Sequence, residues 1–497
     1  MGWANSLCLT GMNNKNVIMR RKFLGVLQLM LITGLLLPGC NKWDDHNSLT
    51  DPMVGKDLFQ QISENAALSK FAELLTKSGY DKVIASSKTY TVFAPTNTAL
   101  STLDPAIVND SARLRMFVGN HIANQLYQTT TTPVRLQMLN GKYNNLQGKL
   151  LEDANITIAD QYTKNGYLQV LDKMLPALPS AWEFLETSPL APAKQKAYLL
   201  SLFRNVFNPA NAVQIGINPA TGLPIYQAGT DSIRTNIFWR DVHDLRNESK
   251  QYTFFMLSDA AWDSEENKYK PFFITGDADS TTRLADSAIV KDLAVEGYYP
   301  QSTLPDTLLS KFNVKVGINK SAIVQTVKVS NGIVYIMRSV DVRPKDKFQQ
   351  YIIEAESYRG SSADRRGNTY FRDRFNPLTG QQFRDVLVFN HGLAMFNLNY
   401  RLTNVPALKF RAYWVALHDN INNNTATFTQ KLGIGSPTST VLPYITVAVN
   451  DYREIYIGEF SSTTYMPFLN LFLTAANTTT ANTNPIVCDY IRLEPVL

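Results

Sequence analysis

Hydrophobic residues in the first third of the chain follow two different periods. Six apolar side chains between residues 58 and 75 lie at helical spacing, which predicts amphipathic helices. A β-branched and aromatic run at 91–95 leads into Thr96-Asn97, whose side chains can accept backbone N–H groups and begin a helix. The turn Asn165-Gly166 then precedes alternating apolar positions, which predict a half-buried strand. The pattern predicts a unit of mixed α and β structure.

Both strand motifs recur farther along the chain. Thr91–Ala99 recurs as Thr253–Ala261, and Asn165–Asp172 recurs as Asn331–Arg338. The motifs begin 74 residues apart in the first copy and 78 residues apart in the second. Two unlike motifs at nearly equal separation indicate a duplicated unit. Residues 208–229, which are rich in Pro, Gly and Asn, predict a long loop inserted in the second copy.

After residue 346 the period changes to that of strands. In residues 409–417, Lys409, Arg411 and Tyr413 alternate with apolar residues, which predicts one buried and one outward face. Residues 444–449 and 468–473 show similar alternation, and polar turns separate the runs. Several short strands with such turns predict an antiparallel sandwich or jelly roll.

Composition narrows the class of protein. A length of 497 residues predicts about three domains. The hydrophobic fraction of 44% excludes wholesale disorder, and the low charged fraction of 18% is typical of extracellular β-rich proteins. Four of the 48 basic residues and no acidic residue precede Cys40, so 44 basic residues face 42 acidic ones in the remainder. A net charge of +2 provides no electrostatic surface for nucleic acid.

The amino end has the features of a secretory signal. Met19-Arg20-Arg21-Lys22 is followed by the apolar run 23–37, too short for a membrane span of about 20 residues. Residues 1–39 are therefore predicted to be a signal peptide with an upstream extension, translation beginning at Met1 or Met19. Leu37–Cys40 resembles a bacterial lipobox, although Pro38 departs from its usual pattern.

That resemblance implies that Cys40 is lipidated and anchors the chain to a membrane. A plain secreted protein with a buried Cys40 is the alternative. Residues 41–45, a basic position followed by two acids, resemble the export tag of surface lipoproteins of the Bacteroidetes type. The resemblance implies the outer membrane as location, with the protein facing the cell exterior.

The repeated motifs resemble the fasciclin domain, a family associated with extracellular adhesion. The first copy, within 40–180 after the lipidated Cys40 and a short linker, matches both motifs and supplies His121 at the family's central histidine position. The second copy, 181–345, is degenerate, with Leu257 in place of the proline and no matching histidine. His121 is predicted to be structural, because no partner nucleophile is visible for a general base.

The ends of the last segment, 346–497, resemble galactose-binding-like jelly rolls, which include many carbohydrate-binding modules. The resemblance rests on Ile353–Glu356 and Asp489–Leu493, which would form neighbouring first and last strands. It implies a structural calcium ion held by Glu354, Glu356 and Asp489, the two glutamates sharing one face of a strand. Solvated carboxylates at an edge strand are the alternative.

Few other residues carry candidate chemistry. Tyr413 and Tyr465 are candidates for stacking on a sugar ring, with ordinary half-buried tyrosines as the alternative. Cys488, the one cysteine after Cys40, is predicted to be a buried hydrophobe, so no intramolecular disulfide is expected. Asp277–Thr281 begins like a calcium loop but lacks its later ligands and is predicted to be a turn.

No zinc-protease, paired-cysteine, serine-hydrolase or phosphate-loop motif occurs. The sequence therefore predicts a non-catalytic cell-surface lipoprotein, with two fasciclin-like α+β domains followed by an all-β jelly roll. Its expected partners are a membrane and a polysaccharide or surface protein. The alternatives are an accessory docking subunit of an outer-membrane glycan-uptake complex and a glycan hydrolase with its site in the β domain.

Overall fold

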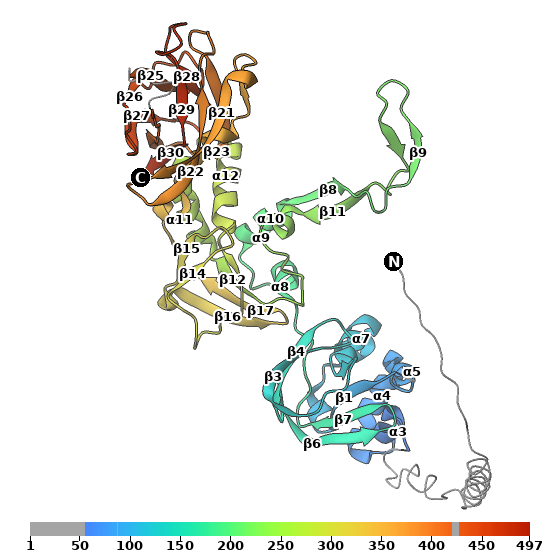
Figure 1. Cartoon of the computed structure of the whole chain (residues 1–497). Coiled ribbons are helices and arrows are strands. Elements are labelled where there is room, and N and C mark those ends of the chain that lie inside the picture. The colour runs from blue at the N-terminus through green and yellow to red at the C-terminus, as the bar shows by residue number, and fades with distance from the viewer. Residues whose placement is uncertain (1–54, 87, 420–426) are drawn as a thin grey trace, which may run out of the picture. The chain divides into compact units, whose positions relative to one another are not determined.

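The computed structural model describes residues 55–497, except residue 87 and residues 420–426 (Figure 1). The chain forms two compact units, one ending at Pro176 and the other comprising Gly141–Tyr143 and Ala177–Leu497. We call the first copy of the repeat the first module, the second copy the second module and the remainder, from Tyr351, the β domain. Within the described residues, no helix has the length and apolar character needed to cross a membrane.

The first module packs short helices against a seven-stranded sheet of order β2-β1-β7-β6-β5-β4-β3. Its helices are α3 (Leu58–Ser63), α4 (Ser69–Ser78), α5 (Tyr80–Ile84), α6 (Pro105–Asn109) and α7 (Ser111–Gly119). Its strands are β1 (Tyr90–Pro95), β2 (Ile122–Ala123), β3 (Thr130–Gln137), β4 (Tyr143–Gly148), β5 (Leu150–Leu151), β6 (Ala154–Thr163) and β7 (Gly166–Leu171). The two predicted motif strands are thus β1 and β7, and both are buried along their whole length.

The second module repeats this arrangement around the sheet β13-β12-β17-β16. Its helices are α8 (Ala181–Thr187), α9 (Ala193–Ser201), α10 (Ile237–Asp241), α11 (Asp259–Tyr269), α12 (Ala278–Val290) and α13 (Pro344–Lys347). Its strands include β12 (Tyr252–Leu257), β13 (Ala294–Glu296), β14 (Thr307–Leu309), β15 (Lys315–Gly317), β16 (Ile323–Val329), β17 (Gly332–Met337) and β18 (Asp341–Val342). Asp277–Thr281, predicted to be a turn, instead begins α12, because the Asp277 side chain accepts the backbone N–H of Ser280.

The same strand register occurs at the centre of both modules. Strand β1 runs parallel to β7 with Tyr90 opposite Gly166, and β12 runs parallel to β17 with Tyr252 opposite Gly332. In each pair the glycine is required by close approach, since a Cβ atom would lie 1.9 Å from the carbonyl oxygen of the facing tyrosine. The duplication seen in the sequence is therefore a duplication of backbone geometry.

The asparagine before each glycine has the same function in both copies. Asn165 accepts the N–H of Leu58 at 2.9 Å and donates to the carbonyl oxygen of Ile84 at 2.5 Å. Asn331 accepts the N–H of Ala181 at 2.8 Å and donates to the carbonyl oxygen of Leu245 at 2.9 Å. Because both side chains are buried, these bonds satisfy backbone groups that water does not reach.

His121 is structural, as the sequence predicts. Its ring is fully buried between two backbone groups, with Nδ1 3.0 Å from the carbonyl oxygen of Phe117 and Nε2 accepting the N–H of Leu175 at 3.0 Å. Burial lowers the pKa of His121 to about 4, so the ring is neutral near pH 7. In the second module Leu293 takes this place, since its carbonyl bonds to Phe255 as that of His121 bonds to Phe93.

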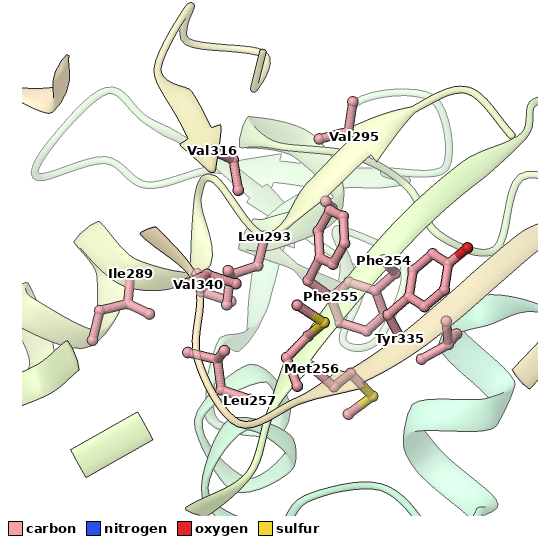
Figure 2. Close-up of a cluster of buried hydrophobic side chains, with 14 of the residues drawn as sticks. Phe254, Phe255, Met256, Leu257, Ile289, Leu293, Val295, Val316, Tyr335 and Val340 are labelled. Carbon is pink, nitrogen blue, oxygen red and sulfur yellow. The ribbon is translucent and has the colours of Figure 1, made fainter. Parts of the chain in front are cut away.

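The second module has a continuous hydrophobic core (Figure 2). Phe255 and Tyr335, on the paired strands β12 and β17, stack with ring centroids 5.8 Å apart. Figure 2 also shows Leu293 and Ile289 among these side chains, so an aliphatic residue fills the histidine position of the first copy. The degenerate copy retains a packed core without the central histidine.

The segment 208–229, predicted to be a long loop, is most of a β arm. Its base is the two-stranded pair β8 (Phe203–Phe207) and β11 (Ser232–Asn236), and its distal part is the pair β9 (Gln214–Ile217) and β10 (Pro224–Tyr226). Figure 1 shows the two hairpins extending one after the other from α9 and α10. Pro, Gly and Asn mark the turns of these hairpins, and the alternating Ile and Val residues between them form the strands.

The β domain is an antiparallel sandwich. One sheet has the order β19-β30-β24-β27, a second β20-β23-β28-β25-β26 and a third β21-β22-β29. The strands are β19 (Tyr351–Glu354), β20 (Gly360–Ser361), β21 (Thr369–Asn376), β22 (Gln381–Val388), β23 (Asn397–Val405), β24 (Lys409–Trp414), β25 (Phe428–Ile434), β26 (Ile445–Val447), β27 (Ile455–Ser461), β28 (Met466–Ala475), β29 (Ile486–Cys488) and β30 (Tyr490–Val496).

The first and last strands, β19 and β30, pair side by side as the sequence predicts, with Glu354 opposite Tyr490. On β24 the alternation is also confirmed, because Phe410, Ala412 and Trp414 are buried while Lys409 and Arg411 are exposed. The fold is therefore two α+β modules followed by an all-β sandwich.

We expect Gly332→Ala to destabilise the second module by about 2–4 kcal/mol, because the added methyl group collides with the backbone of Tyr252. Urea unfolding monitored by tryptophan fluorescence measures the change. The control is Gly276→Ala, where a Cβ atom meets nothing within 4 Å, and its effect should stay within about 0.5 kcal/mol. Equal effects of the two substitutions would contradict the close-approach explanation.

Candidate functional site

The outer face of the sheet β19-β30-β24-β27 carries a cluster of aromatic and charged side chains. Tyr413 of β24 lies on this face and is half-buried. The guanidinium carbon of Arg492, from the adjacent strand β30, lies 4.1 Å from the centre of the Tyr413 ring. One side of the Tyr413 ring is therefore already occupied, and this tyrosine is not a free platform.

An acidic residue fixes the arginine in place. Arg492 donates to both carboxylate oxygens of Glu454, at 2.7 Å from Nε and 2.6 Å from Nη2. The hydroxyl of Tyr490 donates to the same carboxylate at 3.0 Å. These bonds hold the pKa of Glu454 below its usual value and raise that of Arg492, so both groups are charged at neutral pH.

The exposed ring of the cluster is Tyr456, which the sequence analysis did not identify. Tyr456 of β27 lies directly opposite Tyr413, with ring centroids 5.4 Å apart, and 51% of the residue is exposed. The signal in the sequence was the alternation of residues 454–457, in which Tyr456 occupies a polar position between Ile455 and Ile457. We call Tyr413, Tyr456, Arg492, Glu454 and Tyr490 the tyrosine–arginine cluster.

Tyr465 lies in different surroundings. It is half-buried, its hydroxyl donates to Oδ1 of Asn404 at 2.6 Å, and its ring lies 5.8 Å from that of Phe273. It also lines a cleft of about 900 Å³ together with Tyr198, Arg204 and Arg283. The structure thus does not bring the two predicted tyrosines into one site.

The three predicted calcium ligands are close enough to interact electrostatically. The pKa of Asp489 is raised to about 7, first by burial and then by the negative charges of Glu354, Asp385 and Glu356 in that order. Burial, and then the charge of Glu356, raises the pKa of Glu354 as well. Oxygen Oε2 of Glu356 is buried without a hydrogen-bond partner among the described residues.

The geometry nevertheless differs from the expectation. Glu354 ends β19, whereas Glu356 lies in the 3₁₀ turn Ala355–Ser357, so the two glutamates do not share one face of a strand. Across the part of the chain that the structure describes, no three His, Cys, Asp or Glu residues form a group that could hold a metal ion. The acids carry the charge and one unsatisfied oxygen suited to a hard cation, but they are not arranged as a formed ligand set.

Cys488 is buried in β29, and burial raises the pKa of its thiol well above the usual value. The prediction of an inert hydrophobe at this position is consistent with that environment. Cys40 lies outside the described residues, and its lipidation stays a prediction.

Comparison with known proteins identifies part of the chain. The fasciclin-domain family model matches residues 66–177, so the first module contains a fasciclin domain. The curated proteins include no significant match to this sequence.

Several solved structures are similar to parts of the chain at low sequence identity. The fasciclin domain pair of the insect cell adhesion molecule fasciclin I is 17% identical over 57% of this chain and all of its own, with a TM-score of 0.23. The CBM36-1 domain of a xylanase from the hindgut metagenome of Trinervitermes trinervoides is 15% identical over 30% of this chain and 98% of its own, with a TM-score of 0.21. A carbohydrate-binding module CBM36, solved with calcium and xylotriose, is 15% identical over 29% of this chain and 99% of its own, with a TM-score of 0.20.

Asp489 makes the stability of the β domain depend on pH. Its pKa of about 7 exceeds the value in an unfolded chain, so the folded state holds an extra proton between about pH 4 and pH 7. Stability is therefore lost as the pH rises through this interval, and the loss is complete above pH 7. We expect Asp489→Asn to raise the free energy of unfolding by roughly 1–3 kcal/mol at pH 8 and to leave it almost unchanged at pH 4.

Urea unfolding at the two pH values measures this difference. The matched control is Asp373→Asn, at an exposed position of β21. A gain that is the same at pH 4 and pH 8, or that appears equally in the control, would show that Asp489 is not the titrating group.

Proposed function

We propose that the protein is a non-catalytic, cell-surface lipoprotein that binds glycan through its β domain. The observation that carries this proposal is the tyrosine–arginine cluster, in which an exposed ring lies beside a fixed pair of charged groups. A sugar ring offers a flat C–H face and a rim of hydroxyl groups. The first can stack on Tyr456, and the second can bond to Arg492 and Glu454.

The cluster is organised before any ligand arrives. Arg492 is held by the Glu454 carboxylate and by the Tyr413 ring, so little side-chain freedom remains to be lost on binding. Tyr413 then packs against Arg492 and Tyr456, and Tyr456 supplies the contact surface. This assignment revises the role expected for Tyr413 and leaves Tyr465 as a residue of the separate cleft.

The anchor and location belong to the same proposal. The lipobox-like residues before Cys40 and the acidic positions after it support attachment to the outer membrane with the body facing outward. Docking onto a membrane complex for glycan uptake would use the same exposed position.

Calcium held by Glu354, Glu356 and Asp489 would neutralise the mutual repulsion of these acids. The pH dependence of stability described above would then disappear when calcium is added.

We expect the chain from residue 41 to be retarded in polysaccharide-containing gels by at least one glycan of a broad panel. Tyr456→Ala should weaken that binding by about 5- to 150-fold, because a stacking ring contributes roughly 1–3 kcal/mol at the centre of a contact. Affinity electrophoresis over a series of polysaccharide concentrations gives the dissociation constants.

The control is Phe468→Ala on β28. Phe468 is also an exposed ring, with the guanidinium carbon of Arg401 5.2 Å from its centre, but it belongs to the other large sheet. Equal losses of glycan affinity in Tyr456→Ala and Phe468→Ala would show that the tyrosine–arginine cluster is not the binding site. Retardation by no glycan would favour docking, and release of reducing sugar would establish a hydrolase instead.

We expect metabolic labelling with a radioactive fatty acid to mark the protein, and Cys40→Ala to abolish the label because the acyl chain has no other attachment point in the lipobox. Fractionation of the cells should then move the variant from the membrane to the soluble fraction. Persistence of the label in the variant would show that Cys40 is not the lipidated residue.

A further inference from the structure

The β arm of the second module, residues 203–236, presents large apolar side chains to solvent along its length. Ile215 and Ile217 of β9 are 64% and 63% exposed, and Leu223 beside β10 is 64% exposed. Val206, Phe207, Val213, Ile225 and Ile233 are exposed as well. So many exposed large apolar side chains on one short segment indicate a contact surface.

Beyond its base, which holds Arg204, Asp231 and Arg234, the arm also lacks charge. Residues 205–230 contain no Asp, Glu, Lys, Arg or His. Charged side chains are depleted in the cores of protein interfaces, whereas solvent-exposed hairpins usually carry them to prevent edge-to-edge association. Residues 205–230 of the arm have no such protection.

Each half of the arm is a sheet of only two strands, so every strand has one edge without a neighbour. Backbone N–H and C=O groups along a free edge can bond to another strand, but a lipid bilayer offers them no partner. The open edges therefore favour a protein strand over a membrane as the occupant. Strand β9 is the better edge of the distal hairpin, because β10 begins with Pro224, which has no N–H to donate.

The chemistry of β9 suits pairing with an identical strand. Ile217 lies opposite Pro224 and Gly216 lies opposite Ile225, so the part of the hairpin next to its turn is wholly apolar. Beyond these pairs the register shifts, and Gln214 lies opposite Tyr226. A symmetric contact places each residue of a surface against residues of the same surface, and any unbalanced charge would repel its own copy. An uncharged strand meets this requirement, whereas a different partner protein would normally be selected through placed charges, which the distal hairpin does not supply.

We propose that the arm is a self-association surface, on which the arm of a second copy of this chain seats by antiparallel pairing of β9 edges. The paired strands would cover Ile215 and Ile217 of both copies. The arm begins at α9 and ends at α10, and so holds this contact away from the core of the second module (Figure 1).

Cysteine cross-linking tests the proposal on the full chain. In a parent protein with Cys8→Ser and Cys40→Ser, kept in mild detergent, the remaining Cys488 is buried and unreactive. Under copper-catalysed oxidation, Ile215→Cys or Ile217→Cys should give at least about tenfold more disulfide-linked dimer than Val324→Cys. Val324 is the matched control, being 58% exposed on β16, outside the arm.

Sedimentation velocity on the same parent protein gives an independent measure. The parent should show a concentration-dependent dimer, which the double substitution Ile215→Asp and Ile217→Asp removes, whereas Val324→Asp leaves it intact. A monomer at all concentrations, or cross-linking that is equal at positions 215 and 324, would overturn the proposal. After removal of the detergent, flotation of a monomeric parent with phosphatidylethanolamine–phosphatidylglycerol vesicles, lost in the double variant, would assign the arm to lipid and overturn the proposal as well.

Discussion

In both modules, two parallel strands meet where a glycine lies directly beneath a tyrosine carbonyl. Sequentially distant strands can run parallel only if a long connection returns the chain to the same end of the sheet. The close approach at Gly166 and Gly332 fixes that return, and the preceding asparagine ties it to the start of a helix. The helices and outer strands of each module are arranged around this junction. It is the constraint that the two copies share even where their side chains have diverged.

The β domain depends on a different closure, the pairing of its first strand with its last. That pairing brings carboxylates from both ends of the domain into one neighbourhood, with Ala355 bonded to the backbone of Asp489. The acids repel one another in the folded state, so part of the stability of the closure is lost when they ionise. The ionised cluster lowers the stability of the folded domain, and a bound cation would offset this loss by neutralising the charges.

Much of this architecture could be predicted from the sequence. The repeated motifs located the central strands, and strand alternation correctly buried Trp414 while it turned Lys409 and Arg411 outward. The arm was missed because its turns are so rich in Pro, Gly and Asn that they outweighed short strands of Ile and Val. Only part of the candidate site could be predicted. Tyr413 was placed on the correct face, but pairing with Tyr456 and Arg492 depends on strand order, which local periodicity does not encode.

The base of the arm has a consequence for how this protein can change. Phe203 lies opposite Asn236 in the β8–β11 ladder, so the first and last residues of the arm are direct neighbours at its base. Residues between these two positions can be inserted, deleted or substituted while the surrounding helices keep their places. The contact surface of the arm can therefore change in length or sequence without a change in the core of the second module.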